Sequence, residues 1–483
     1  MEKSVRGEAE DRRKLNRPVR TTAVIMGLLF LSMLAYFLWF EIFGRQAVID
    51  NPNNNRFDTA ENKVIRGEIR TSDGVVIAGT EEGKTKDEDV RYYQHHQLFA
   101  PITGYTAMGK TNLEASFNST LMTSGIDPLS MLKNDLLGIR SPGNNVITTI
   151  DSDLQHFCYT LLGERTGSIT VMEPATGKIL AMVSNPTYDP NTVKEDWEWL
   201  TSPDNNTGCL LNRSTQGIYP PGSTFKIVTA IEYMREHPDT YRDFHFVCTG
   251  SYTDREGNIV HCDSGTAHGE LDLKHAVAHS CNCAFVCMSE TLDPKKYREL
   301  CEELGFNDQI IDELPSRRSV VTVNEGSSVF EISQTAFGQG YTTETPLQNL
   351  MITAMAANRG KLMKPEIIER IEDGNGKVKE TVKPESLGEI LTTDQADYLN
   401  ECLIAVVNEG TTPQAQSEYC QTAGKSGSAQ YSAGLDDLHA WFTGYAPAEN
   451  AQIAVTVMLE KGGHGSPDAA PLFKQVVDYY FSR

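Results

Sequence analysis

The middle of the chain reads Tyr219-Pro-Pro-Gly-Ser-Thr-Phe-Lys226, in which Ser223 stands three residues before Lys226. If this pair opens a helix, the 3.6-residue repeat brings both side chains onto one face. A hydroxyl is a weak nucleophile until an adjacent base takes its proton, and a buried lysine of lowered pKa can be that base. Pro-Pro-Gly favours a tight turn into a helix N-terminus, where free N–H groups can stabilise an oxyanion. The segment therefore predicts an activated serine nucleophile.

Two later segments make this weak signal specific. Ser280-Cys281-Asn282 begins 57 residues after Ser223, and Lys425-Ser426-Gly427-Ser428 begins 145 residues after Ser280. Each motif alone is compatible with an ordinary solvated turn or helix face. The ordered set S-x-x-K, S-x-N and K-[ST]-G is the signature of penicillin-binding proteins and serine β-lactamases.

The second motif supplies polar groups beside the base. We expect Ser280 to relay a proton between Lys226 and the leaving amine. The amide of Asn282 can bind both the N–H and the C=O of a peptide substrate. These residues complete the predicted catalytic group.

The third motif is expected to bind the substrate. Lys425 raises the local positive potential, and the hydroxyls of Ser426 and Ser428 can bind a substrate carboxylate. Gly427 has no side chain, so a substrate backbone can approach this strand closely.

The N-terminal region has the pattern of a membrane anchor. Residues 1–20 hold seven Lys or Arg and four Asp or Glu, and Thr22–Phe43 carries a single charge, Glu41. About 20 apolar residues span a bilayer, and a basic flank stays cytoplasmic. We expect a cytoplasmic tail at 1–20, one transmembrane helix at 21–43 and an extracytoplasmic remainder, all held at the cell membrane. A cleaved signal peptide is the alternative, but the span is long and no small-x-small site follows it.

The charge of the chain limits its partners. It contains 43 Lys and Arg against 65 Asp and Glu, a formal net charge of −22 at pH 7. An acidic ectodomain argues against binding to nucleic acid or to anionic lipid. We therefore expect neither partner.

Two of the ten cysteines flank a turn-rich insert. Cys248 and Cys262 can pair there as a disulfide, which the sequence leaves open. A zinc site made of Cys248, His261, Cys262 and His268 is the other alternative, although its spacing matches no standard zinc finger.

Three further cysteines, Cys281, Cys283 and Cys287, lie close together in the sequence. On one helix, Cys281 and Cys283 point about 200° apart. We therefore expect them not to share a ligand site. Overall we expect no metal site and no cofactor.

The hydrophobic pattern predicts an α+β domain at residues 145–483, after a small β-rich domain at 44–144. Strands at both ends of the later domain, with helices between them, make a sheet covered by helical layers. Its expected helices are Asp151–Leu162, Thr224–Arg235, Leu271–Met288, Leu347–Asn358 and Asp468–Phe481, and its expected strands are Ser168–Glu173, Ile179–Ser184, Ala440–Tyr445 and Gln452–Leu459. In the first domain we expect a hairpin around Ser72-Asp73-Gly74, a helix at Asn112–Thr123 and a linker at Asp135–Asn145.

From about Val146 onward the chain resembles the transpeptidase domain of penicillin-binding proteins. Besides the three motifs, the resemblance rests on Thr149–Asp151, Met172–Pro186, Tyr188–Asn191, Asn212-Arg213, Gly338–Tyr341, Thr345–Gln348, Asn408–Gly410 and Gly444–Pro447. Upstream, Arg66-Gly67, Asp73-Gly74, Thr103–Tyr105 and Leu113–Ser116 are similar to the non-catalytic pedestal domain of class B members. Residues 44–144 are too few for the glycosyltransferase domain of class A proteins, so the resemblance implies class B.

The resemblance implies a fold of the penicillin-binding and serine β-lactamase type. It implies a serine D,D-transpeptidase that crosslinks peptidoglycan stem peptides through an acyl-enzyme, with β-lactams as acylating substrate mimics. It also implies a SEDS-family glycan polymerase as partner. The catalytic residues would be Ser223, Lys226, Ser280 and Asn282, with substrate bound at Lys425–Ser428.

Two residues of the third motif differ from those that the family usually has, and the middle residue of the second motif lies at a position where the family tolerates different residues. Ser426 and Ser428 stand where the family usually has threonine, and Cys281 occupies a position that tolerates variation. Both serines keep the hydroxyl and lose only a methyl group. We expect activity with some change in β-lactam fit.

Three alternatives share the first chemical step. A D,D-carboxypeptidase differs only in its acceptor and stays open. A non-catalytic β-lactam sensor carries its ligand domain after several membrane spans and a cytoplasmic protease, which this sequence lacks. A class A β-lactamase activates water with a Glu-x-x-Leu-Asn segment, but Ala396 stands where Tyr398-Leu399-Asn400 would need the glutamate.

Overall fold

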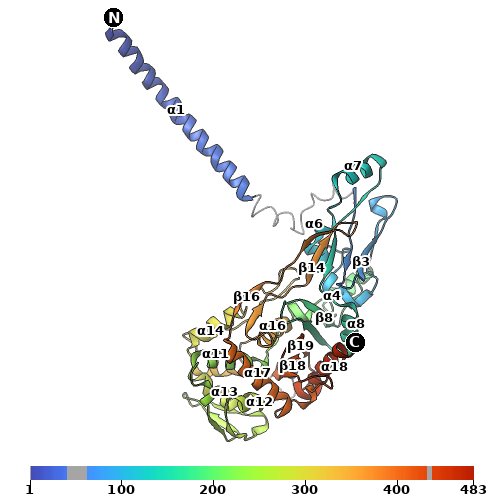
Figure 1. The fold of residues 1–483 in the computed structure, drawn as a ribbon, viewed down its shortest axis with the longest axis vertical. Helices are drawn as coiled ribbons and strands as arrows, with labels where there is room; N and C mark the ends of the chain where they lie inside the picture. Colours follow the sequence, from blue (N-terminus) through green and yellow to red (C-terminus); the bar gives the residue numbers. More distant parts are fainter. Residues whose placement is uncertain (1, 41–62, 432–437) are drawn as a thin grey trace. The chain divides into compact units, whose positions relative to one another are not determined.

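The computed structural model describes residues 2–40, 63–431 and 438–483 (Figure 1). The chain divides into two compact units, Met1–Thr59 and Ala60–Arg483. In the first unit the described residues form one helix, α1 (Glu2–Trp39), and its Thr21–Trp39 part is long and apolar enough to cross a membrane, with a mean hydropathy of 2.0. This agrees with the predicted span, whose last three residues, 41–43, lie outside the described residues.

The second unit is built from many short elements. Its α-helices are α4 (Ala100–Thr103), α5 (Asn112–Ser116), α6 (Asn118–Leu121), α7 (Pro128–Leu137), α8 (Ser152–Leu162), α9 (Val193–Leu200), α10 (Arg213–Gln216), α11 (Lys226–Glu236), α12 (Leu273–Ala278), α13 (Asn282–Ser289), α14 (Pro294–Glu303), α15 (Val329–Ala336), α16 (Pro346–Ala357), α17 (Thr393–Asn408) and α18 (Ala470–Ser482). Its strands are β1 (Val64–Ile65), β2 (Ile69–Arg70), β3 (Val76–Glu81), β4 (Val90–Tyr92), β5 (Ser141–Pro142), β6 (Asn145–Thr148), β7 (Gly167–Met172), β8 (Ile179–Asn185), β9 (Phe246–Cys248), β10 (Ser251–Thr253), β11 (Ile259–His261), β12 (Gly269–Leu271), β13 (Lys361–Met363), β14 (Ile368–Glu372), β15 (Val378–Thr381), β16 (Ser386–Glu389), β17 (Ala423–Gln430), β18 (Leu438–Ala446) and β19 (Ile453–Leu459). Single turns of tighter or wider helix are η3 (Lys86–Glu88), η4 (His96–Phe99), η5 (Gly222–Phe225), η6 (Tyr241–Asp243), η7 (Asp263–Gly265), η8 (Pro413–Ala415) and η9 (Gly465–Ala469).

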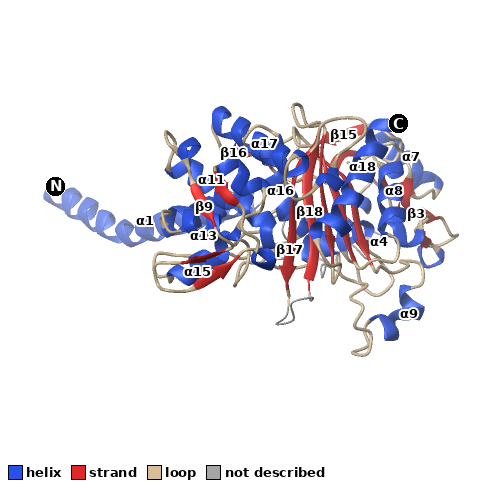
Figure 2. Ribbon diagram, turned by 90° about the horizontal axis from the view of Figure 1, so that it is seen from below, coloured by secondary structure: helices blue, strands red, loops and turns tan. Residues whose placement is uncertain are grey.

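A five-stranded antiparallel sheet, in the order β17-β18-β19-β7-β8, forms the centre of the later part of the chain (Figure 2). Helices α8 and α18 pack on one face, where Leu154, Phe442 and Phe473 are fully buried in one apolar cluster. Helix α16 packs against β19 and β18 on the other face. This is the predicted sheet covered by helical layers, and it holds β17, the strand of the third motif.

A six-stranded sheet, in the order β15-β14-β6-β2-β3-β4, contains the predicted hairpin. Strands β2 and β3 pair antiparallel around Ser72-Asp73-Gly74, with Ile69 opposite Ala78. Strands β14 and β15 come from much later in the sequence, and β14 pairs with β6. The sheet therefore joins segments from both expected domains, and the division near residue 144 stays a proposal.

Two smaller expectations in the first domain need correction. The expected helix at Asn112–Thr123 is two short helices, α5 and α6, which separate at Phe117. The expected linker at Asp135–Asn145 begins inside α7 and contains β5. Asp127 caps α7 by accepting hydrogen bonds from the N–H groups of Leu129 and Ser130, a signal that the sequence contained.

A buried carboxylate holds the first part of this unit together. Glu114 on α5 is fully buried and forms ion pairs with Arg66 at 2.6 Å and with Arg91 at 2.7 Å. Burial opposes ionisation of Glu114, but these two arginines lower its pKa below the usual range. The cluster ties the chain before β2, strand β4 and helix α5 to one another.

Candidate active site

The nucleophile turn forms where the sequence predicted it. The turn η5 (Gly222–Phe225) carries Ser223 and runs directly into α11, which begins at Lys226. Gly222 has a φ of +58°, and a Cβ there would lie 3.0 Å from the carbonyl oxygen of Ser428. Glycine is therefore required both by the backbone conformation and by the close approach of β17.

Lys226 is the centre of the site. Its side chain is fully buried, and its Nζ lies 3.2 Å from the Oγ of Ser223 and 3.1 Å from the Oγ of Ser280. The same nitrogen donates to the carbonyl oxygen of Ser280 at 2.6 Å and to the Oδ1 of Asn282 at 2.7 Å. The structure thus brings all four predicted catalytic residues together.

These contacts suit a neutral lysine. Burial lowers the pKa of Lys226 to about 8. A neutral amine has two N–H groups and one lone pair. The carbonyl oxygen of Ser280 and the Oδ1 of Asn282 can only accept, so they take the two N–H groups. The lone pair is left for the hydroxyl proton of Ser223.

The second motif lies in a break between two helices. One helix was expected at Leu271–Met288, but α12 ends at Ala278 and α13 begins at Asn282. Between them Ser280 has a φ of +54°, a left-handed conformation that is costly for serine. The break places the Oγ of Ser280 3.1 Å from the Nζ of Lys226 and lets this oxygen accept a hydrogen bond from Lys425 at 3.0 Å.

The amide of Asn282 is engaged within the protein. Its Oδ1 accepts from Lys226, and its Nδ2 donates to the carbonyl oxygen of His261 at 3.1 Å. The expected contact with a peptide substrate therefore stays a prediction. In the described residues this amide links Lys226 to the last residue of β11.

The third motif lies on β17, beside the nucleophile turn. Lys425 is fully buried and donates to Ser280, and burial followed by the charge of Lys226 holds its pKa well below the ordinary range. Ser426 accepts a hydrogen bond from the hydroxyl of Thr412 at 2.9 Å, and Ser428 accepts one from the N–H of Gly465 at 3.1 Å. The sequence did not single out Thr412 or Gly465, because both lie far from the motif along the chain.

The space beside Gly427 is filled by the protein itself. A Cβ at this position would lie 2.9 Å from the carbonyl oxygen of Pro221 and 3.0 Å from the Cγ2 of Thr224. The glycine thus allows the nucleophile turn to pack against β17. The close approach predicted at Gly427 is therefore made by the nucleophile turn, and not by a substrate backbone, in the described residues.

A buried acid beneath the nucleophile was missed by the sequence reading. Glu344 is fully buried, and burial raises its pKa to about 8. Asn349 on α16 donates to the carboxyl of Glu344 and, at 2.9 Å, to the hydroxyl of Thr224, the residue after Ser223. The backbone of Glu344 pairs with Tyr219 through two hydrogen bonds. Glu344 stands directly before Thr345–Gln348, a segment that carries the family resemblance but contains no catalytic motif.

The positions of the cysteines beside the second motif correct one expectation. All ten cysteines are in the described part of the chain and are free there, and the Sγ atoms of Cys248 and Cys262 lie 3.7 Å apart. Cys281 lies outside the helix as the N-cap of α13, so Cys281 and Cys283 both approach the Sγ of Cys262, at 3.6 and 3.4 Å. The expectation that they point apart on one helix was wrong, because the helix breaks at Ser280.

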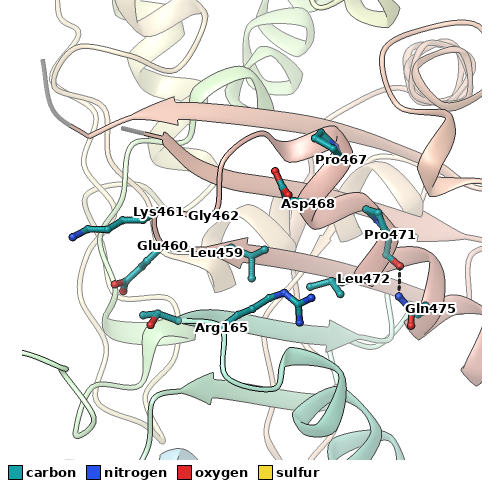
Figure 3. Close-up of a pocket in the computed structure, with 11 residues that line it drawn as sticks. Arg165, Leu459, Glu460, Lys461, Gly462, Pro467, Asp468, Pro471, Leu472 and Gln475 are labelled. Atoms are coloured by element: carbon teal, nitrogen blue, oxygen red, sulfur yellow. Dashed lines mark hydrogen bonds between the residues drawn. The ribbon is translucent and has the colours of Figure 1, made fainter. Parts of the chain in front are cut away.

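One pocket of about 450 Å³ lies away from the motifs (Figure 3). It opens where β19 ends and α18 begins, with Arg165 opposite Asp468 and with Gln475 donating to the carbonyl oxygen of Pro471 at 3.1 Å. None of the motif residues lines it. It is therefore separate from the candidate active site.

Two protein families match consecutive parts of the chain, which together make up most of its length. Residues 167–478 match the family described as "Penicillin binding protein transpeptidase domain". Residues 66–146 match the one described as "Penicillin binding protein A dimerisation domain". The first match covers more than half of the chain and includes all three motifs.

Individual relatives agree with this match. The peptidoglycan D,D-transpeptidase PbpA of Mycolicibacterium smegmatis is 28% identical over 493 residues, which cover 96% of this chain and 98% of that protein. The peptidoglycan D,D-transpeptidase MrdA of Haemophilus influenzae is 30% identical over 451 residues, covering 83% and 67%. The ceftriaxone acyl-enzyme complex of penicillin-binding protein A from M. tuberculosis has a TM-score of 0.79 and 25% identity, covering 87% of this chain and 99% of that one. With the three motifs assembled around Lys226, these matches establish that the chain belongs to the penicillin-binding proteins, as a class B member with a transpeptidase domain.

Proposed function

We infer that the chain is a membrane-anchored serine D,D-transpeptidase, which crosslinks peptidoglycan stem peptides and is acylated by β-lactams. One observation carries this inference. The fully buried Nζ of Lys226 lies within hydrogen-bonding distance of the hydroxyls of both Ser223 and Ser280. A nucleophile, a neutral base and a second hydroxyl are the groups that acyl transfer requires.

Acylation begins at Ser223. Lys226 takes the hydroxyl proton as Oγ attacks the carbonyl carbon of the penultimate D-Ala. The resulting oxyanion is held by the backbone N–H groups of Ser223 and Ser428. As the tetrahedral intermediate collapses, the peptide C–N bond breaks and D-Ala leaves. The proton held by Lys226 reaches the leaving nitrogen through the hydroxyl of Ser280, and the serine ester remains.

The third motif binds the carboxylate of the donor peptide. The positive potential of Lys425 and the hydroxyls of Ser426 and Ser428 favour a negative group above β17. An amine of a neighbouring stem peptide then attacks the ester carbonyl, and the proton that this amine loses passes to Lys226 through the hydroxyl of Ser280. Ser223 leaves with a proton returned by Lys226, and the crosslink is formed.

A D,D-carboxypeptidase would use the same acyl-enzyme and transfer it to water. The distinguishing experiment supplies the full-length protein in detergent with a peptide donor that ends in D-Ala-D-Ala, with and without an amine acceptor. We expect crosslinked product that grows with acceptor concentration at the expense of hydrolysis. Hydrolysis that is indifferent to the acceptor would support the carboxypeptidase instead.

We further propose that α1 crosses the cell membrane with residues 1–20 in the cytoplasm and residues 44–483 outside. The excess of Lys and Arg before the apolar span supports this orientation. We propose that residues 44–144 form a pedestal that places the catalytic domain beside a SEDS-family glycan polymerase. Tethering raises the effective concentration of the two strands at the site. An anchorless protein, exported by a cleavable signal, should then be acylated normally but fail to restore growth to depleted cells. Full restoration would contradict the scaffold role.

A further inference from the structure

The two serine hydroxyls of the third motif each accept a hydrogen bond from within the protein. The Oγ of Ser426 accepts from the hydroxyl of Thr412 at 2.9 Å, and the Oγ of Ser428 accepts from the N–H of Gly465 at 3.1 Å. Residues two apart on a strand point to the same face, so both hydroxyls lie on one side of β17. Each hydroxyl still has its proton to donate, and the described part of the chain gives that proton no acceptor.

The hydroxyl of Thr412 belongs to a short chain of hydroxyls. Thr412 is fully buried in the segment that follows α17, and its Oγ1 lies 3.2 Å from the Oγ1 of Thr411. A hydroxyl has only one proton. Because Thr412 gives its proton to Ser426, Thr411 is the donor in the other bond. The hydrogen bonds therefore run in one direction, from Thr411 through Thr412 to Ser426, and bonds in such a chain strengthen one another.

The second donor reaches β17 because Gly465 has no side chain. A Cβ at this position would collide with the carbonyl oxygens of Trp441 on β18 and Gly427 on β17. The next residue, Ser466, donates to the carbonyl oxygen of Thr411 at 2.7 Å. The two segments that supply the donors are thus hydrogen-bonded to each other as well as to the motif.

We propose that Thr412 is a specificity-determining positioning residue, which together with the N–H of Gly465 makes Ser426 and Ser428 hydrogen-bond donors toward the substrate. Two protons presented on one face suit a group that only accepts, such as the carboxylate of the donor peptide or of a β-lactam. Thr412 acts through Ser426 and touches no reacting atom. The inference rests on the proposed function, because it explains how that same site selects a free carboxylate.

The test compares two substrates that differ only in this carboxylate. Full-length protein in detergent is treated with penicillin G or with its methyl ester, and intact-protein mass spectrometry follows acylation. The ratio of the two rate constants measures the selection. Both rates come from one preparation, so the folded fraction cancels in the ratio. The wild type should be acylated faster by the carboxylate than by the ester.

The variants at Thr412 test its hydroxyl. Thr412→Val keeps the shape of the side chain and should lower the ratio about 3- to 10-fold, the effect of one net hydrogen bond. Thr412→Ser keeps the hydroxyl and should retain most of the wild-type ratio. Thr422→Val is the matched control, because Thr422 is also buried but donates to the carbonyl oxygen of Ala415 at 2.9 Å. It should leave the ratio unchanged.

A double-mutant cycle separates a positioning role from a direct one. Ser426→Ala alone should lower the ratio at least about tenfold, because its hydroxyl donates to a charged group. In that background Thr412→Val should change the ratio by less than about twofold, since the residue through which it acts is gone. A wild-type ratio in Thr412→Val, an equal loss in Thr422→Val, or the same loss with and without Ser426 would overturn the proposal. Wild-type protein that penicillin G does not acylate would overturn the proposed function, and this inference with it.

Discussion

The Nζ of Lys425 lies 3.0 Å from the Oγ of Ser280, although 145 residues separate them in the sequence. The same oxygen lies 3.1 Å from the Nζ of Lys226. One hydroxyl therefore stands between two buried lysines, one from each side of the site. Burial and the charge of Lys226 lower the pKa of Lys425. This arrangement suits a proton relay, since the hydroxyl can accept from one lysine while it donates to a leaving amine.

Removing this hydroxyl should interrupt the relay. Ser280→Ala should slow acylation by a β-lactam by at least ~10²-fold, the low end for loss of an acid–base group. Ser289→Ala is a matched control on the adjoining helix, because its hydroxyl donates only to the carbonyl of Val286. The rate constant from stopped-flow fluorescence decides the outcome. Similar rates in the two variants would remove Ser280 from the mechanism.

The acylation rate should follow the ionisation of Lys226. Burial disfavours the ammonium form and lowers the pKa to about 8, and only the neutral amine can take the proton of Ser223. The rate should therefore rise about tenfold per pH unit below that value and level off above it. Lys226→Arg should be inactive throughout, because a guanidinium stays protonated. A profile that is flat in the wild type would assign the base to another group.

Glu344 should make stability depend on pH. Its pKa is about 8 in the folded protein against 4.5 for the free side chain. Between these values the folded protein holds a proton that the unfolded chain has released, so the free energy of unfolding falls as pH rises. Glu344→Gln keeps the shape and removes the titration. Its Tm relative to the wild type should rise from about pH 4.5 to about pH 8. A constant Tm difference over that range would show that the carboxyl is ionised in the folded state.

Glu114 should be essential for the stability of the first part of the unit. Glu114→Ala leaves Arg66 and Arg91 close together without their shared carboxylate. Breaking a buried pair in this way costs about 3–5 kcal/mol. Glu81→Ala, at the exposed end of β3, should change stability by less than about 0.5 kcal/mol. Chemical denaturation compares the two, and equal midpoints would contradict the structural role of the cluster.

Much of the site could be predicted because the residues of each motif lie within a few positions of one another in the sequence. The spacing of Ser223 and Lys226 suffices to place both on one turn. The apolar pattern predicts helices α8 and α16 and strands of the central sheet. The order of the three motifs along the chain is enough to indicate the family, because it does not depend on how the motifs contact one another.

Other features depend on contacts between distant segments. The apolar pattern of Leu271–Met288 continues through Ser280, whereas the lysines that hydrogen-bond to this residue lie 54 and 145 positions away in the sequence. The break in the helix at Ser280 also turns Cys281 toward Cys262, which no helical spacing indicates. The pairing of β14 with β6 joins residues more than two hundred positions apart, and short strands carry no signal of their partners.

The covalent adduct with penicillin tests the central claim most directly. Full-length protein treated with a fluorescent penicillin should gain one label, which peptide mass spectrometry should locate on Ser223. The label should persist for many minutes, because Ala396 stands where a β-lactamase of class A has its water-activating glutamate, and Ser223→Ala should lose it completely. A label that remains in Ser223→Ala, or that hydrolyses within seconds in the wild type, would contradict a transpeptidase whose nucleophile is Ser223.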